Sequence, residues 1–186
     1  MNRFEVQSLP LTGLKRLIRQ RLSDNRGSLT RIFCAEELAR VGWGKAIAQI
    51  NHTSTVRQGT IRGLHYQVHP HAEMKLVSCL RGEVWDVAVD LRVDSPTFLH
   101  WHAEYLNADN GYSLLIPEGF AHGFQSLTDD VELLYCHSAA FVSTDERGVH
   151  PLDAALEIPW PLPVAELSPR DASHPKLELS FRGLEG

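Results

Sequence analysis

The chain has 186 residues, 43% hydrophobic and 22% charged, a composition typical of one globular domain with a substantial core. Its net charge of -5, with no long basic run, argues against a nucleic-acid polymer as partner, although a few arginines could still hold a single nucleotide. The chain shows no signal-peptide core, no apolar run near the ~18 residues of a membrane helix, and three widely spaced cysteines, so we expect a cytoplasmic protein with reduced thiols.

The first third of the chain predicts short elements separated by turns. Leucines and an isoleucine at positions 14, 17 and 18 recur among basic residues, which fits either a strand or a helical turn. Residues 24–27, Asp-Asn-Arg-Gly, are a turn signal, and residues 36–40 predict a short helix. From Ile47 onward the pattern becomes strand, turn, strand.

Regular alternation makes residues 83–90 the clearest strand. One face carries Trp85, Val87 and Val89 and continues to Leu91, and the other carries the residues at 84, 86, 88 and 90. Arg81-Gly82 predicts a hairpin turn before this strand.

Further short strands are predicted at residues 112–116 and 131–137, each bounded by turn residues. Closely spaced short strands predict a sandwich or barrel. The tail after Trp160 is rich in proline, and we expect it to wrap the sheet as loops and short helical turns.

A histidine and a glycine stand together in the strand around His65. Strict alternation puts Gly63 and His65 on one face and Arg62 on the other. A glycine inside a strand often marks a bulge, and a bulge at Gly63 would let Arg62 and His65 face one cavity. Taken alone, this segment favours a half-buried strand histidine with a backbone partner for His65.

Three more residues could carry chemistry, and each also has a purely structural interpretation. His122 sits in a Pro-x-Gly-x-x-His loop and could simply cap it. Lys75 opens an apolar strand, either as an edge charge that discourages aggregation or as a cation aimed into a cavity. Tyr135 shares a strand face with apolar residues and could be a core tyrosine.

A metal site is the main alternative chemistry for a histidine-rich jelly roll. His69-Pro70-His71 gives an HxH pair, and His122 could add a third nitrogen. The glutamate that metal-binding cupins place a few residues later is missing, because Glu73 follows too closely. The proline also breaks a strand ladder, so we expect no metal.

The motifs, read in order, resemble the dTDP-4-dehydrorhamnose 3,5-epimerase family from about Phe4 to Leu177. The matching segments are Gln49-x-Asn51, residues 59–67 (GTIRGLHYQ), 75–77 (KLV), 81–90 (RGEVWDVAVD), 95–98 (SPTF), 116–124 (IPEGFAHGF), 134–135 (LY), 146–148 (ERG), 158–161 (IPWP) and 167–171 (LSPRD). The resemblance implies an all-β, cupin-like double-sheet jelly roll with a few short helices. It makes residues 1–186 a single domain, with residues 161–186 as a wrapping tail and N-terminal strands exchanged in a homodimer.

The family resemblance also assigns roles. His65 matches the general base, Asp171 the carboxylate bonded to it, Tyr135 the acid on the opposite face of the sugar, and Lys75 the lysine near the C4 oxygen. No cofactor is implied. Residues that match substrate contacts or their supports are Arg26, Gln49, Asn51, Arg62, Asp86, His122, Glu146 and Arg170, with Arg26 reaching the nucleotide across the dimer interface.

These residue types suit the reaction on chemical grounds. A histidine with a pKa near ~6.5 is largely basic at neutral pH and can remove a proton next to a ketone. A fixed cation stabilises the charge that develops on the ketone oxygen, and a tyrosine hydroxyl can exchange a proton on the other face. Arginines can grip the phosphates of a nucleoside diphosphate, whose binding energy positions the sugar.

Two departures from the family pattern bear on specificity. After Arg26-Gly27 the family has aromatic residues and a glutamate near the base, where this chain has Leu29 and Arg31. Another nucleotide than dTDP is therefore an alternative. A family tyrosine is replaced by Phe141, which would either alter the choice of sugar or limit epimerisation to C3 or C5 alone.

The sequence thus predicts an epimerase of a nucleoside-diphosphate 4-keto-6-deoxy sugar that inverts C3 and C5 on the way to L-rhamnose or a related deoxysugar. The alternatives are a mono-epimerase, a metal-dependent cupin enzyme using His69, His71 and His122, and a non-catalytic sugar-nucleotide binding protein. A pure binder has no need of the full acid-base set.

Overall fold

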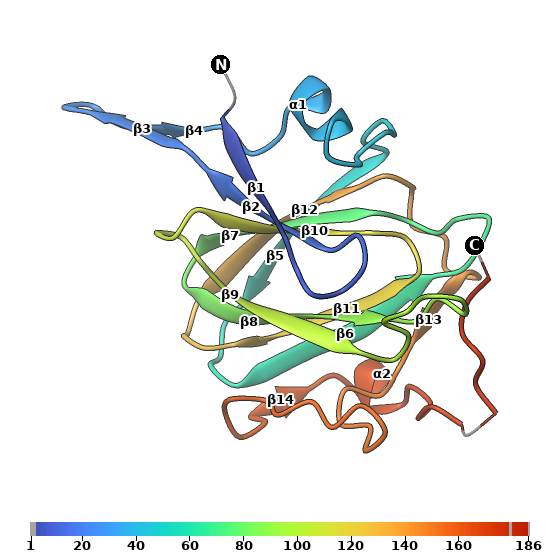
Figure 1. Ribbon diagram of the computed structural model, residues 1–186. Helices are drawn as coiled ribbons and strands as arrows, with labels where there is room; N and C mark the ends of the chain where they lie inside the picture. Colours follow the sequence, from blue (N-terminus) through green and yellow to red (C-terminus); the bar gives the residue numbers. More distant parts are fainter. Residues whose placement is uncertain (1–2, 179, 186) are drawn as a thin grey trace.

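The computed structural model describes residues 3–178 and 180–185, and its regular structure is almost entirely β-strand (Figure 1). Two six-stranded sheets form the body. The first contains, in spatial order, β1 (Phe4–Ser8), β2 (Lys15–Arg19), β10 (Tyr112–Ile116), β7 (Lys75–Arg81), β12 (Val131–His137) and β5 (Gln49–Thr55). The second contains β13 (Glu146–Gly148), β6 (Thr60–Gln67), β11 (Phe120–Ser126), β8 (Glu83–Asp90) and β9 (Trp101–Asn107), with β14 (Glu166–Leu167) beside β6.

Three small elements complete the chain: the hairpin of β3 (Arg21–Asp24) and β4 (Gly27–Thr30), and the helices α1 (Ala35–Ala39) and α2 (Pro169–Ala172). The predicted all-β jelly roll with a few short helices is therefore confirmed. The ends of the predicted single domain, residues 1–2 and 186, lie outside the described residues. Within the described part of the chain, neither helix has the length and apolar character needed to cross a membrane.

Most predicted elements lie where the sequence placed them. The segment left open as strand or helical turn is β2, and the turn signal at 24–27 closes the hairpin of β3 and β4. The strands at 83–90, 112–116 and 131–137 are β8, β10 and β12 with the predicted bounds, and the short helix is α1.

The predicted hairpin at Arg81-Gly82 is wrong. Strand β7 before it pairs with β10 and β12 in the first sheet, whereas β8 after it pairs with β9 and β11 in the second. Gly82, at a φ of 72°, turns the chain from one layer to the other. Alternating hydrophobicity marks a strand but does not show which sheet it joins, so a tight turn alone could not distinguish a hairpin from a corner.

The two faces of β8 explain why its alternation is so regular. Val84 and Ala88 point into the core between the sheets, together with Phe124 and Leu133. Trp85 and its neighbours on the other face pack against residues of the C-terminal tail, among them Leu177 and Phe181. A third cluster lies under α1, against the outer face of the first sheet. The outer faces of both sheets are thus covered, and the space between the sheets holds both the hydrophobic core and the cleft of the site.

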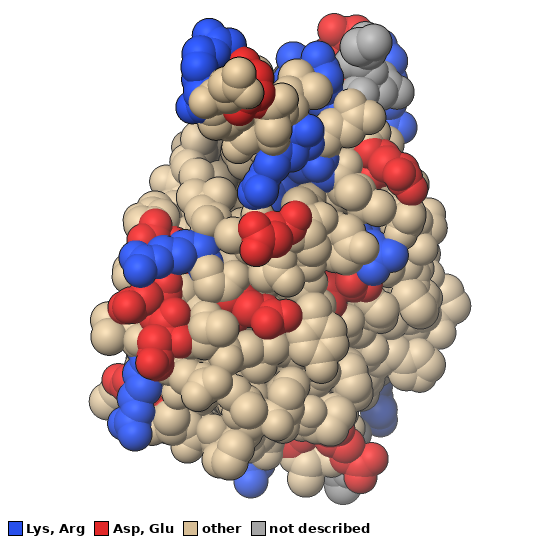
Figure 2. All heavy atoms as spheres, turned by 90° about the vertical axis from the view of Figure 1, so that its left-hand side faces the viewer, with Lys and Arg blue, Asp and Glu red and all other residues tan. Residues whose placement is uncertain are grey.

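Charges of both signs are interspersed on the face shown in Figure 2. Lysines and arginines lie beside aspartates and glutamates over this surface and do not form a broad basic area. On this face, the described residues offer no continuous positive surface of the kind that binds a nucleic-acid polymer.

Candidate active site

A cleft of about 480 Å³ opens between the two sheets. Its walls come from β6 and β11 on one side and from β5, β7 and β12 on the other, with α2 at the rim. Most of the predicted site residues line this cleft: Gln49, Asn51, Arg62, His65, Lys75, His122, Tyr135, Glu146, Arg170 and Asp171. Of the other two, Asp86 lies beneath His122 and Arg26 lies on the β3–β4 hairpin.

The bulge predicted at Gly63 is present in β6. His65 pairs with His122 and Arg62 with Phe124, so on β11 only Gly123 faces Gly63 and Leu64. A Cβ atom on Gly63 would lie 2.6 Å from the Cα of Gly123, so the close approach requires glycine. As a result, both Arg62 and His65 line the cleft, although strict alternation would separate them.

His65 is bonded to a buried carboxylate. It donates its Nε2–H to Asp171 Oδ1 at 2.7 Å, and the Asp171 side chain is 5% exposed against 29% for His65. Burial by itself would raise the pKa of Asp171, but the hydrogen bond and charge of His65 and the Gly63 N–H outweigh it, and the pKa is lowered. A carboxylate that stays ionised holds the proton on Nε2 and leaves the Nδ1 of His65 free to accept another.

Asp171 owes its position to a short helix that the sequence encodes locally. Ser168 is the N-cap of α2, its Oγ accepts the Asp171 N–H at 3.0 Å, and Pro169 occupies the first turn. The other Asp171 oxygen accepts the Gly63 N–H at 3.3 Å. The tail therefore brings a carboxylate to a strand 106 residues away in sequence from it.

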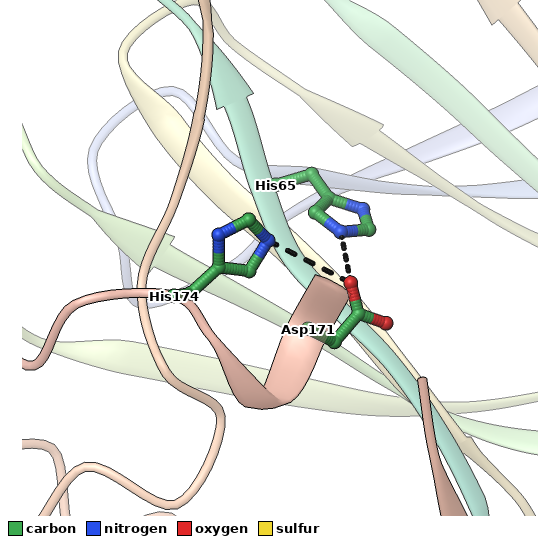
Figure 3. Close-up of side chains that lie close together, drawn as sticks. All are labelled: His65, Asp171 and His174. Carbon is green, nitrogen blue, oxygen red and sulfur yellow. Dashed lines mark hydrogen bonds and ion pairs between the residues drawn. The ribbon is translucent and has the colours of Figure 1, made fainter. Parts of the chain in front are cut away.

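A second histidine approaches the same carboxylate (Figure 3). His174 follows α2, its Nε2 lies 3.6 Å from Asp171 Oδ1, and its ring meets that of His65 edge to face at 5.3 Å. That Nε2 is buried and has no hydrogen-bond partner in the described structure. Burial, and then the charge of His65, lower the pKa of His174.

Lys75 points into the cleft and is not an edge charge. Its Nζ donates to the His65 carbonyl at 3.0 Å and lies 3.0 Å from Glu73 Oε1, and both side chains are under 10% exposed. Gln67 donates to the other oxygen of Glu73. Because an ammonium has three N–H donors, the lysine can direct the remaining one at a ligand.

Tyr135 lies on the wall opposite His65. Its strand, β12, belongs to the first sheet, whereas β6 belongs to the second. Burial, and then the negative charge of Asp86, raise the pKa of the Tyr135 phenol well above its ordinary range. Its hydroxyl is therefore protonated at neutral pH and is available as a proton donor.

His122 is held beneath the cleft by Asp86. Its Nε2 lies 3.0 Å from each Asp86 oxygen, and the side chains of the pair are 5% and 0% exposed. The His122 ring also packs against Tyr135, edge to face at 5.9 Å. The carboxylate thus fixes the orientation of the imidazole that faces the cleft.

The predicted binding residues surround this centre. Arg62 donates to Thr55 Oγ1 at 3.0 Å, and Arg170 forms an ion pair with Glu146 at the rim. Gln49 donates to Asn51 at 3.0 Å on the edge strand β5. Their side chains offer cations and amides around the cleft entrance.

Arg26 lies apart from the cleft of its own chain. Its hairpin projects from the body of the molecule (Figure 1), and the Arg26 side chain is 89% exposed and paired with Asp24. Its predicted contact across a dimer interface stays a prediction.

Glu73 and His137 line the cleft and His174 lies beside Asp171, and the sequence reasoning assigned none of these three to the site. His137 stacks on Tyr135 at 6.0 Å, and burial, then the charge of Lys75, lower its pKa to about 4. Alternation on β12 already placed His137 on the face of Tyr135, so that signal was available. The Asp-x-x-His spacing of Asp171 and His174 indicates that the two side chains meet only once the helical turn of α2 is known.

The alternative metal set does not come together. His71 is paired with Asp145 at 2.6 Å, His122 with Asp86, and His69 is exposed. Among the described residues, the three side chains whose ligand atoms converge are His65, Asp171 and His174. The three histidines of the alternative set, His69, His71 and His122, therefore do not form a common metal site.

Comparisons with known proteins point to one family. The sequence profile of the family described as dTDP-4-dehydrorhamnose 3,5-epimerase matches residues 8–178. An enzyme of that name from Sinorhizobium fredii is 37% identical, over 95% of this chain and 91% of its own length. A dTDP-4-dehydrorhamnose 3-epimerase from Streptomyces niveus is 36% identical, over 90% and 81%.

A solved structure is similar over the whole fold. The dTDP-6-deoxy-D-glucose-3,5-epimerase of Legionella pneumophila, in complex with dTDP-4-keto-L-rhamnose, superimposes with a TM-score of 0.90 at 36% identity. The match covers 95% of this chain and 94% of that one. The double-sheet fold is thus shared with an enzyme that binds a nucleotide sugar.

Proposed function

The chain belongs to the dTDP-4-dehydrorhamnose 3,5-epimerase family, and we propose that it inverts C3 and C5 of dTDP-4-dehydro-6-deoxyglucose to give dTDP-4-dehydro-L-rhamnose. The observation that carries the proposal is the arrangement of one cleft. A His65–Asp171 pair lies on one wall, and Tyr135 and Lys75 lie on strands of the other.

The first step is removal of a proton next to the C4 ketone. His65 takes this proton on Nδ1, because Asp171 already accepts the proton on Nε2. The electron pair moves to the ketone oxygen, where the ammonium of Lys75 stabilises the enolate. The buried pair with Glu73 holds that ammonium in place.

The second step returns a proton to the opposite face of the same carbon. Tyr135 supplies it, because its hydroxyl is protonated at neutral pH and its strand lies on the wall opposite His65. Proton removal and return on opposite faces invert the carbon. Once His65 has released its proton to solvent and Tyr135 has taken one from solvent, the step can be repeated at the second carbon, because both carbons flank the ketone. The chemistry requires no cofactor.

Proton NMR of the full-length protein in deuterated water, with dTDP-4-keto-6-deoxyglucose, tests this function. Loss of both the C3 and C5 proton signals supports the double epimerase. Replacing His65 with Asn should slow this exchange by about 10³-fold, within the range of general-base catalysis. Retained exchange in His65→Asn would contradict the assignment of the base. Absence of exchange in the wild-type protein would contradict the reaction with this nucleotide sugar.

A mono-epimerase is the second candidate, favoured by Phe141. Its side chain lines the cleft, at a position where the family resemblance implies a tyrosine hydroxyl. The Streptomyces niveus relative, a 3-epimerase, shows that both outcomes occur among similar sequences. The same NMR experiment decides, because a mono-epimerase loses a single signal, at C3 or at C5.

We also propose a homodimer in which Arg26 serves the cleft of the partner subunit. The projecting hairpin supports this, because Arg26 and Leu29 are both highly exposed on it. A chain carrying Arg26→Ala and one carrying His65→Asn should each be inactive. Co-expressed, they should recover about a quarter of the wild-type sites if Arg26 acts in trans, because half of the dimers are mixed and each has one intact site. No recovery in mixed dimers would show that Arg26 acts within its own chain.

A further inference from the structure

We propose that His65, Asp171 and His174 together bind Zn²⁺ and that the bound ion blocks the epimerase. The metal-binding half of this proposal stands on the side-chain geometry, and the inhibitory half rests on the proposed role of His65. The starting observation is that one ligand atom from each of the three residues lies within 4.8 Å of the other two.

The separations suit a tetrahedral ion. Zinc binds imidazole nitrogens and carboxylate oxygens at about 2.0–2.1 Å, so neighbouring ligand atoms lie ~3.3 Å apart. Asp171 Oδ1 lies 2.7 Å from His65 Nε2 and 3.6 Å from His174 Nε2, values on either side of that separation. Figure 3 shows both rings turned toward the carboxylate, so small side-chain rotations suffice to admit an ion.

The donor set is the one zinc prefers. Two imidazoles and a carboxylate supply three ligands, which leaves a fourth position for water. His174 brings a buried Nε2 without a partner in the described structure, so no hydrogen bond must be broken for it to bind. The second Asp171 oxygen is already held by the Gly63 N–H, the kind of support that orients a ligating carboxylate.

The surroundings tolerate a cation. The nearby Arg170 is paired with Glu146, so its positive charge is largely compensated. Asp171 adds a buried negative charge of its own. The His65 side chain is 29% exposed to the cleft, which gives an ion a way in.

Other histidine–aspartate pairs provide an internal contrast. His71–Asp145 has a similarly short separation of 2.6 Å, but no third ligand converges on it among the described residues. Two ligands bind zinc far more weakly than three, so His71 serves as a matched control for unspecific binding at a surface pair.

Occupation of the site would disable the base through its tautomer. Neutral imidazole carries one proton, which His65 holds on Nε2 while Asp171 accepts it. Coordination of zinc by Nε2 requires the lone pair there, so the proton moves to Nδ1 and no proton is released. Nδ1 is the atom that would take the C3 or C5 proton, and once protonated it cannot do so.

Calorimetric titration of the chelator-treated, full-length protein with Zn²⁺ tests the site. The expected result is one site in the wild-type protein that weakens by about 100-fold or more in His174→Ala, since even loss of a supporting residue costs 10–100-fold. His71→Ala should bind zinc like the wild type. Equal zinc affinity in the wild type and in His174→Ala would overturn the proposal.

Deuterium exchange at C3 and C5 tests the inhibition. Zinc should stop exchange in the wild-type protein at concentrations that leave His174→Ala active, because His174 lies outside the proposed catalytic set. Continued exchange with the site filled would refute the block while leaving the site itself established. Absence of exchange before zinc is added would instead count against the proposed function, and the titration would still report on the site.

Discussion

The cleft contains two histidine–aspartate pairs that use the same atoms in different surroundings. In the His65–Asp171 pair the imidazole is 29% exposed, and its carboxylate comes from a short helix in the C-terminal tail. In the His122–Asp86 pair the side chains are 5% and 0% exposed, and both residues lie on adjacent central strands, β11 and β8. Chemical identity alone does not assign a role to either pair.

The difference in burial and anchorage separates the two roles. The ring of His65 reaches the cleft and is held by one oxygen of Asp171, so its free nitrogen can take a proton from a ligand. The ring of His122 is fixed by both oxygens of Asp86 inside the sheet, so it is suited to hold a ligand in place. The His65–Asp171 pair can exchange protons with a ligand, whereas the His122–Asp86 pair holds the His122 ring in a fixed position.

Removal of the Asp171 charge should have the largest effect. Asp171→Asn keeps the shape but no longer favours the His65 tautomer with Nδ1 free, so we expect the exchange rate to fall by about 10³-fold. The measurement is deuterium incorporation at C3 and C5 under substrate saturation, with circular dichroism to confirm the fold. A fall of less than about 10-fold would mean that the charge of Asp171 does not set the tautomer of His65.

The corresponding change in the buried pair should act mainly on stability. Asp86→Asn leaves His122 without its charged acceptor, and we expect the free energy of unfolding in urea to fall by about 1–3 kcal/mol. The exchange rate should fall by only about 10-fold. Asp145→Asn is the matched control, because its partner His71 is 42% exposed and such surface pairs contribute little to stability. Equal losses for the two variants would show that burial does not distinguish the pairs.

The stability contributions of His137, beside the buried His122–Asp86 pair, and of Asp171 should also be lost in different pH ranges. The pKa of His137, which stacks on Tyr135 beside the buried pair, is lowered from 6.5 to about 4. Between these values the unfolded chain binds more protons than the folded protein, so stability is lost as the pH falls through this window. The pKa of Asp171 is lowered from 3.8, so its contribution is present above that value and is lost only at lower pH.

Replacement of His137 isolates the upper window. His137→Gln should remove about 1–2 kcal/mol of the stability change between pH 6.5 and pH 4, an effect expected of a histidine that is neutral when folded. Urea unfolding at a series of pH values measures this. An unchanged pH profile would mean that His137 can be protonated in the folded protein.

The sequence predicted local structure well because the signals were local. Alternating hydrophobicity predicted β8, β10 and β12 with their bounds. The glycine at position 63 indicated the bulge that brings Arg62 and His65 to the same cleft. The turn at Gly82 failed for the opposite reason, since the sheet that each flanking strand joins depends on partners far along the chain.

In the candidate site, too, the contacts between residues distant in sequence could not be predicted from local patterns. The sequence offered His65 and Asp171 as partners only through family resemblance, since 106 residues separate them and no periodicity links a strand to the tail. His174 became visible only in three dimensions, when a single helical turn carried it back to Asp171. The salt bridge of Lys75 with Glu73 also needs the fold, because side-chain direction at the start of a strand is not encoded by spacing.

The smallest effect should come from loosening the anchorage of Asp171 without touching its charge. Ser168→Ala removes the N-cap of α2, which costs about 1 kcal/mol where the helix is otherwise intact. We expect a fall of about 2- to 5-fold in the maximal exchange rate with little change in KM, because the carboxylate spends less time in place. Since α2 is only four residues long, the loss concentrates on the residue that it positions.

Ser78→Ala is the control for this last change. The hydroxyl of Ser78 is hydrogen-bonded to the hydroxyl of Ser113 at 2.7 Å in the first sheet, away from the His65–Asp171 pair. Its loss should reduce stability by a similar amount, about 0.5–1.5 kcal/mol, while the exchange rate stays unchanged. If Ser168→Ala reduced stability but left the rate unaltered, the tail would hold Asp171 by packing alone. If Ser168→Ala and Ser78→Ala slowed exchange equally, activity would follow global stability. The position of Asp171 would then not control the rate, and the proposed difference between the His65–Asp171 and His122–Asp86 pairs would be wrong.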